Sequence, residues 1–574
     1  ITPYDIGFFL LMFICSVLAA TTALFVIHVP VTSLHFFLSL GLSTAVMLFF
    51  YPLKTAVKLA IIGVLIIVAC IIFAGLFFDL TWDGNAYRKT ITYMLKQGYN
   101  PVYESFFDAV ARIGTIKNAS PGWPPWYEGY PKGAQTFAAV IYAVTNNIET
   151  GKCINPLLIL SASLIVYGIL HQLFKLKPYQ AALCAVSLCA NPVTLVQICN
   201  FYDDGALGML LFICIASLLY LTLRGDGTYP AQSGEGKLTR KSYAAIFASI
   251  VIGFNVKFSA IIHFAIFTGA FYFYWLIKDL YSNRWKKLSR PTIHSGLFFM
   301  LCAIAGVAVF GFAPYITNIF RFGTPLYPLF GQGAIDILSG NTPTPIRNQS
   351  LVVQFVYSFL SATSNDLNLP VDLKIPFTSQ PQEFAFIQAV DTRLGGWGVS
   401  FSGVAIISII VIVFFLFKFF RQKRAPCIAA LVLFAAVVIP IFAVPGMFWA
   451  RYNLQLFIIP VMALVMLFSC ADKPSGYIAP FLMLVLIAGN AVPSISTSDI
   501  YRKSQEIREQ LRVVKELNES YVVEVTNLTG YDFNGQFINM FDAGVVNYEI
   551  VNELEGYDGT FYANFPIAYK AKSR

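Results

Sequence analysis

The sequence predicts an all-α polytopic membrane protein that ends in a small α/β domain. The chain has 574 residues, of which 57% are hydrophobic and only 12% are charged, whereas soluble proteins carry about 25% charged residues. Apolar runs long enough to cross a bilayer as helices recur through residues 1–493. From residue 494 to residue 574 the composition becomes that of a small soluble domain. These observations exclude an ordinary soluble enzyme.

About thirteen apolar runs fit the length of a membrane-spanning helix. They lie near 6–28, 33–50, 57–78, 154–171, 180–198, 205–223, 242–255, 258–277, 293–314, 402–420, 427–446, 453–470 and 477–493. The run at 242–255 is short, and we expect it to be broken or tilted. Residues 131–150 are also apolar, but we expect an interfacial or re-entrant helix there, because a crossing would reverse every later loop.

Basic loops fix the expected orientation, since cytoplasmic loops are enriched in Lys and Arg. Three such loops are 224–241, 278–290 and 421–424. Counting spans from them places the loops 79–153 and 315–401 and the C-terminal domain outside, and the short loop with Lys175 and Lys177 inside. The net charge of +9 is explained by loop topology, so we expect no nucleic-acid partner.

The C-terminal domain is predicted from two adjoining segments. Residues 498–520 form a charged helical pattern, with Ser498 as its expected N-cap. Residues 521–527, YVVEVTN, are rich in β-branched side chains and predict a strand.

Two groups of acids lie where the chain leaves the membrane on the predicted outer side. Asp79 and Asp83 follow the third span, and their spacing would put them on one helix face if that helix continued. Asp203 and Asp204 follow the fifth span. A carboxylate there can accept a proton from a hydroxyl nucleophile or hold a divalent cation. The alternative is that these acids face water or cap a helix.

Four basic residues lie near the same outer face, where the positive-inside rule disfavours them. They are Arg88, Lys257, Arg321 and Arg451. Bases in these places could bind a phosphate. The alternative for each is that it extends to the interface or pairs with an acid.

The first outer loop is rich in aromatic residues that could form a platform for a sugar ring. They are Tyr87, Trp123, Trp126 and Tyr127, with Glu128 beside them as a partner for sugar hydroxyls. An interfacial belt of Trp and Tyr is the alternative interpretation of the same residues.

One stretch of this loop resembles a known family. The residues WDGNAYRKTITYMLKQGYNP (82–101) are similar to the pattern WDxxxYHxxxxxxLxxGxNP in a bacterial group of the GT-C superfamily, integral-membrane glycosyltransferases that use lipid-phosphate sugars. The order of spans, outer loops and C-terminal domain over most of residues 55–493 resembles this superfamily more loosely. The sequence departs from the pattern at Arg88, where many of these relatives carry His, and an arginine there would favour phosphate.

The resemblance implies a GT-C-like fold in a bacterial plasma membrane, with the active site outside. It implies an inverting transfer of a sugar from a polyprenyl phosphate to a glycan, lipid or protein, with Asp83 as the catalytic base and Asp79 as a helper. Asp203 or Asp204 would be the second acid of the family. Lys257 and Arg451 would bind the donor phosphate.

No cofactor is firmly expected. If a divalent cation such as Mg²⁺ or Mn²⁺ takes part, Asp83 and Asp203 are its expected ligands. Two other functions stay open. A transporter or flippase of lipid-linked sugars would predict inverted repeats and broken midplane helices, which the sequence does not display. A catalytically silent GT-C-like subunit, with partners in a membrane complex, is compatible with the departure at Arg88.

Overall fold

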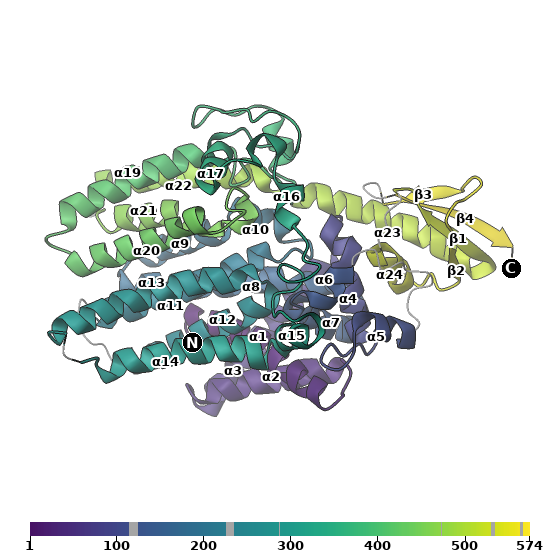
Figure 1. The fold of residues 1–574 in the computed structure, drawn as a ribbon, viewed down its shortest axis with the longest axis horizontal. Helices are drawn as coiled ribbons and strands as arrows, with labels where there is room; N and C mark the ends of the chain where they lie inside the picture. Colours follow the sequence, from purple (N-terminus) through teal and green to yellow (C-terminus); the bar gives the residue numbers. More distant parts are fainter. Residues whose placement is uncertain are drawn as a thin grey trace.

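The computed structural model describes residues 1–113, 124–225, 235–285, 287–471, 473–529, 534–562 and 566–573. The described chain is mostly helical, with a four-stranded sheet close to its C-terminus. Figure 1 shows the long helices side by side and the sheet projecting beyond one end of the bundle.

Nine helical segments of the described residues are long and apolar enough to cross a membrane. They are α1 (Pro3–Val26), α3 (Leu53–Gly75), η2 with α8 (Ile148–Leu173), α11 (Asp204–Gly225), α13 (Ser259–Ser282), α14 with η3 (Arg290–Val309), α19 (Phe401–Phe419), α20 (Arg424–Ala443) and the run from η8 to α23 (Pro474–Ser520). Outward-facing apolar side chains such as Phe417, which is 90% exposed, suit a lipid environment. The structure therefore agrees with a polytopic membrane protein.

The other four of the thirteen predicted spans are not among these nine long apolar segments. They correspond to α2 (Ser33–Leu48), α9 (Pro178–Cys189), α12 (Glu235–Val256) and α21 (Ile458–Phe468). The predicted span 180–198 is broken, because Asn191 caps and Pro192 begins a separate short helix, α10 (Pro192–Gln197). The helix at 242–255, expected to be broken or tilted, is not broken, since α12 is continuous and begins seven residues earlier among charged side chains. A tilt in the membrane stays a prediction.

Shorter helices gather in the two predicted outer loops. They are the π-helical turn η1 (Gly84–Arg88), α4 (Lys89–Lys96), α5 (Phe106–Ile113), α6 (Pro124–Gly129) and α7 (Gly133–Thr145) in the first, and α15 (Thr317–Phe322), α16 (Ile337–Asn341), α17 (Leu351–Leu360) and α18 (Glu383–Phe386) in the second. With 13 residues, α7 extends about 20 Å and is too short to cross a bilayer alone. This length agrees with the prediction for residues 131–150.

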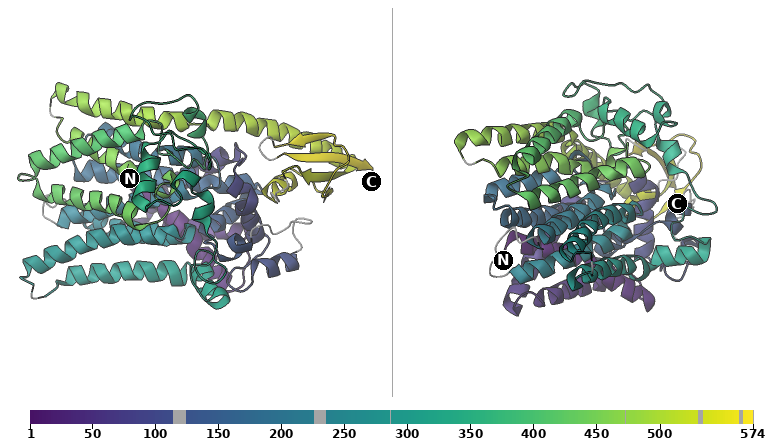
Figure 2. Two further views of the ribbon diagram at one scale, coloured as in Figure 1. Left: turned by 45° about the horizontal axis from the view of Figure 1, so that its top comes forward. Right: turned by 60° about the vertical axis from the view of Figure 1, so that its left-hand side comes forward.

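The C-terminal domain is connected to the last membrane helix through a long helix, α23. After α22 (Ile478–Ala491) and a 3-10 turn, α23 (Thr497–Ser520) extends past the bundle, as Figure 2 shows. The domain then contains β1 (Tyr521–Asn527), α24 (Asn534–Asp542), β2 (Tyr548–Ile550), β3 (Gly559–Phe561) and β4 (Ile567–Ser573). The sheet order is β2-β1-β4-β3, with β1 parallel to β2 and antiparallel to β4.

The predicted strand at 521–527 is confirmed with the same bounds. Its inward residues Val523 and Val525 are fully buried and pack with Leu511 of α23 and Phe537 of α24, so period-two alternation matches burial. The expected cap Ser498 is wrong, because α23 begins at residue 497 and its N-cap position is the residue before.

The C-terminal domain is hydrogen-bonded to the end of α3, to the residues that follow it and to the first outer loop. The Phe78 N–H donates to Ser504 Oγ at 2.8 Å, and Arg508 donates to the Gly75 carbonyl at 2.8 Å. From α24, Asn539 Nδ2 donates to Glu149 Oε1 at 2.8 Å. These bonds join segments about 400 residues apart in the chain.

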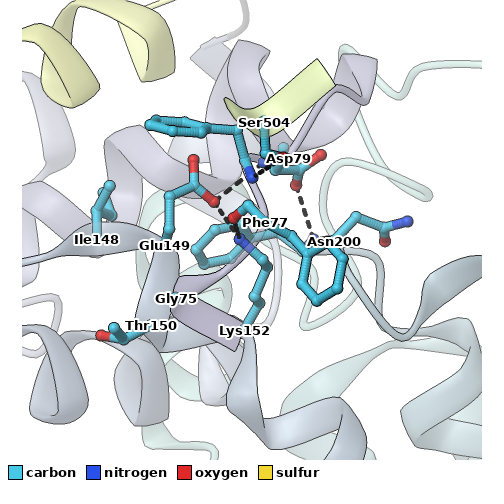
Figure 3. A network of polar contacts seen from close by, with 12 residues as sticks. Gly75, Phe77, Asp79, Ile148, Glu149, Thr150, Lys152, Asn200 and Ser504 are labelled. Carbon is cyan, nitrogen blue, oxygen red and sulfur yellow. Dashed lines mark hydrogen bonds and ion pairs between the residues drawn. The ribbon is translucent and has the colours of Figure 1, made fainter. Parts of the chain in front are cut away.

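Glu149 is the centre of this junction (Figure 3). Its carboxylate pairs with Lys89 at 2.5 Å and with Lys152, and all three side chains are almost fully buried. Lys152 Nζ also donates to the Phe77 carbonyl at 2.6 Å. Removing one member of a buried ion pair leaves an uncompensated charge, which is costly at low dielectric.

We expect Glu149→Gln to lower the free energy of unfolding by about 3–5 kcal/mol, because two buried lysines lose their counter-charge. Thermal unfolding of the purified protein in detergent, followed by Trp fluorescence, measures this loss. The matched control is Glu506→Gln, which removes an exposed pair with Arg502 on α23 and should change stability little. Equal effects of the two variants would contradict the central role of Glu149.

Candidate functional site

A polar cavity of about 370 Å³ lies between the two predicted outer loops. Its wall contains Trp82, Asp83, Tyr87, Arg88, Trp126, Tyr130, Lys257, Ile337, Asn341, Asp391, Arg393, Arg451 and Tyr452. These residues come from the first outer loop, the α12–α13 connection, the second outer loop and the turn after α20. Six residues singled out from the sequence, namely Asp83, Tyr87, Arg88, Trp126, Lys257 and Arg451, therefore share one cavity.

The π-helical turn η1 presents Asp83 and Tyr87 to this cavity. Tyr87 donates its hydroxyl hydrogen to Asp83 Oδ2 at 3.0 Å, and its ring lies 6.3 Å from that of Trp126 in a stacked arrangement. The turn requires glycine at residue 84, because a Cβ there would lie 2.0 Å from Asp79 Oδ2. The backbone carrying Asp83 is thus packed directly on the buried acid Asp79.

The three cavity bases that were singled out from the sequence each have an acid as partner. Arg88 pairs with Asp203, and Lys257 pairs with Asp204, with all four side chains at most 7% exposed. The adjacent acids at the start of α11 therefore serve two different cations. Buried charges of this kind need a partner at low dielectric.

The third cavity base pairs with an acid of the second outer loop. Arg451 Nη1 lies 2.7 Å from Asp391 Oδ1, and the guanidinium carbon lies 4.0 Å from the centre of the Trp449 ring. The Nε atoms of Arg451 and Arg393 are buried and have no hydrogen-bond partner among the described residues. Two cationic side chains of the cavity wall thus retain donors for an anionic ligand.

Asp83 differs from the other cavity acid, Asp391, because no ion pair engages it in the described part of the chain. Its side chain is half-buried, and its described hydrogen bond comes from Tyr87. Burial raises the pKa of the Asp83 carboxyl above its ordinary value; the charge of Arg451 opposes this rise and that of Asp391 adds to it. A carboxylate in this condition is suited to accept a proton.

An apolar groove of about 430 Å³ adjoins the polar cavity. The two share the lining residues Tyr130, Lys257, Ile337 and Tyr452. The rest of the groove is mostly apolar and includes Ile261, Ile262, Leu326, Leu329, Phe330, Ile335, Leu338, Val444 and Met447. A molecule with a charged head and an apolar chain could therefore occupy both spaces at once.

Asp79 does not line this cavity. The two acids were expected to share a helix face if the third span continued through them. Since α3 ends at Gly75, the helix does not continue, and Asp79 and Asp83 do not share a face. The Asp79 carboxylate is fully buried and accepts the N–H groups of Thr81 and Phe201 at 2.7 Å each. Burial raises its pKa, and the charge of Lys89 opposes that rise. Its contacts position the chain rather than face a ligand (Figure 3).

Three other predicted residues lie outside the cavity wall. Arg321 donates to Glu128 at 3.3 Å and to the Glu104 carbonyl at 2.8 Å. The Tyr127 hydroxyl donates to the Ala86 carbonyl at 2.8 Å. The structure uses Arg321, Tyr127 and Glu128 to join segments of the outer loops, while Trp123 lies outside the described residues.

The residues that the second outer loop contributes to the cavity were not predicted from the sequence. Asp391, Arg393 and Asn341 all line it, and Arg393 donates to Asn341 Oδ1 at 2.9 Å. The scarcity of charge that identified Asp83 could also have indicated Asp391 and Arg393, in the segment VDTRLGG.

The expected divalent-cation ligands do not come together. Asp203 is engaged by Arg88 and does not line the cavity, so it forms no ligand pair with Asp83. Across the described ranges, no group of three or more His, Cys, Asp or Glu residues is arranged to hold a metal ion. The described residues thus offer no cluster of protein ligands that includes Asp83 and Asp203, and their joint role in binding Mg²⁺ or Mn²⁺ stays a prediction.

We expect Arg88→Gln and Asp203→Asn to be coupled. Each single change leaves a buried charge alone and should cost about 3–5 kcal/mol, whereas the double variant should cost clearly less than the sum. Chemical or thermal unfolding of the four proteins in detergent gives the coupling energy. Additive losses would contradict the pairing.

The comparisons with known proteins give no relative. No protein-family model matches the chain, and no curated protein or solved structure matches it either. The GT-C resemblance of residues 82–101 therefore stays a prediction, and the function has to be argued from the geometry of the cavity.

Proposed function

We propose that the protein is a glycosyltransferase that moves a sugar from a polyprenyl-phosphate donor to an acceptor hydroxyl at the outer face of the membrane. The observation that carries this proposal is the junction of the polar cavity with the apolar groove. A lipid-linked sugar has the matching division into a polar head and an apolar chain. The first-loop resemblance to GT-C enzymes supports the same assignment.

The proposed donor lies with its prenyl chain in the groove and its phosphate near the shared wall. Lys257 belongs to both spaces, and Arg451 and Arg393 carry buried Nε donors without described partners. Guanidinium groups bind phosphate oxygens in a planar, two-bond arrangement. Trp126 and Tyr87 offer stacked ring faces for the sugar.

In the proposed reaction, Asp83 accepts the proton of the acceptor hydroxyl as its oxygen attacks the anomeric carbon. The bond between that carbon and the phosphate oxygen breaks, and its electron pair stays on the leaving lipid phosphate. The cationic side chains stabilise the charge that develops there. Attack opposite the leaving group inverts the anomeric configuration. Asp83 suits the base role because it forms no ion pair within the described residues and accepts a hydrogen bond from Tyr87.

We expect Asp83→Asn to lower sugar transfer by about 10²–10⁴-fold, because the amide cannot accept the proton. The assay uses the purified protein in lipid nanodiscs with radiolabelled undecaprenyl-phosphate hexose and pentose donors. The control is Asp108→Asn, an exposed acid of the first outer loop outside the cavity, which should retain activity. Retained transfer by a correctly folded Asp83→Asn protein would exclude Asp83 as the base.

The pH dependence of transfer should report the carboxyl of Asp83. A base with a raised pKa is active only above that pKa, so transfer should fall, as pH drops, at a higher pH than the ordinary Asp value of about 3.9. Asp391→Asn removes a negative charge that raises this pKa, and the acidic limb should move to lower pH. Asp372→Asn, at an exposed site of the same loop, should not move it. A limb unchanged by Asp391→Asn would contradict this electrostatic coupling.

A further inference from the structure

A second cavity, of about 630 Å³, lies at the opposite end of the helix bundle. Two helices run from one site to the other. The first residues of α20 line this second cavity, whereas Val444 and Pro445, just after its last residue, line the apolar groove. Likewise α11 begins at Asp204, the partner of Lys257, and its later residues Leu219 and Leu223 line the second cavity.

The separation of the two sites matches the thickness of a bilayer. With 20 residues, α20 extends about 30 Å, which is the thickness of the hydrocarbon core. The second cavity therefore lies at the membrane face that the basic loops predict to be cytoplasmic.

The polar part of the second cavity is cationic. Lys175, Lys423 and Arg424 belong to its wall, and the described lining residues include no Asp or Glu. None of these three bases forms an ion pair within the described ranges, and all three side chains are exposed. This differs from the outer cavity, where Arg88, Lys257 and Arg451 each pair with an acid.

The start of α20 adds hydrogen-bond donors to the same wall. Helix α20 begins at Arg424 without a side-chain cap, and residues 422–426 all line the cavity. The backbone N–H groups of Arg424 and Ala425, the first two residues of α20, have no partner within the helix and, with the helix dipole, favour an anion, whereas the third residue, Pro426, has no N–H. A phosphate placed here would meet both side-chain charge and backbone donors.

The remaining wall is apolar and belongs to membrane-spanning helices. It includes Leu219 and Leu223 of α11, Phe415 of α19, Leu433 of α20, and Met462 and Val465 of α21. The cavity thus combines a basic, anion-binding part at the membrane surface with an apolar part between the helices. A free anion would use only the basic part, whereas a phospholipid would use both parts.

We propose that this cavity binds an anionic phospholipid of the bilayer, with its phosphate between Lys175, Lys423 and Arg424 and an acyl chain along α11, α19 and α21. Charge complementarity selects an anionic headgroup over a zwitterionic one. The proposal does not depend on the glycosyltransferase function, because no residue of the outer cavity takes part.

Native mass spectrometry of the full chain in detergent tests the proposal, with phosphatidylglycerol and phosphatidylcholine of identical acyl chains as probes. Phosphatidylglycerol should bind the unmodified protein at one retained site, and phosphatidylcholine should bind at least about tenfold more weakly. The variant Lys175→Gln/Lys423→Gln/Arg424→Gln should lose about tenfold or more of the phosphatidylglycerol affinity.

Two control variants separate this site from general charge effects. Lys54→Gln/Lys58→Gln/Arg240→Gln removes the same charges from exposed positions near the starts of α3 and α12, outside the cavity, and should bind as the unmodified protein does. Lys175→Arg/Lys423→Arg/Arg424→Lys keeps the charges and should also bind normally. Equal binding of both lipids, or an equal loss in the first control variant, would overturn the proposal.

Discussion

Pairing of buried charge is the constraint on which the outer end of this protein depends. An isolated charge in an apolar surrounding is costly, and three of the four described cations of the cavity wall pair with an acid. The pairs Arg88–Asp203, Lys257–Asp204 and Arg451–Asp391 involve five separate stretches of the chain. Since the partners are distant in sequence, satisfying the charges also assembles the cavity.

The same constraint explains why one acid is chemically distinct. Three of the four carboxylates around the cavity neutralise cations, and Asp83 has only the hydroxyl of Tyr87 in the described structure. An acid tied to a guanidinium is a poor base, because the cation stabilises its ionised form. The cations in turn carry spare donors toward an anion. The proposed base and the proposed anion-binding groups are therefore different side chains of one cavity.

Much of this arrangement could be predicted from sequence, because charge is rare in so apolar a chain. Asp83, Arg88, Lys257 and Arg451 were identifiable from their positions at predicted membrane exits. The pairing of particular acids with particular bases was not identifiable, since it depends on packing between distant segments.

Other failures of sequence-based prediction have local physical causes. Spacing alone put Asp79 and Asp83 on one helix face, and the end of α3 at Gly75 separates them. The break at Asn191 was obscured by apolar residues on both sides of it, although the proline that follows is a helix-start signal. Asp391 and Arg393 lie in an irregular loop, where no periodic pattern indicates which side chains turn inward.

The glycine at position 535 shows how closely the C-terminal domain packs on the turn that carries Asp83. A Cβ there would lie 2.8 Å from Asn85 Cα, so α24 touches the backbone of the very turn that carries Asp83. The abrupt change of composition at residue 494 therefore marks where the chain passes from lipid to water. It does not mark two parts that are structurally independent. A chain that ended at residue 494 would lack α24, whose surface packs against the η1 turn. Substitutions in the C-terminal domain should consequently change the cavity, even though none of the described residues of that domain lines it.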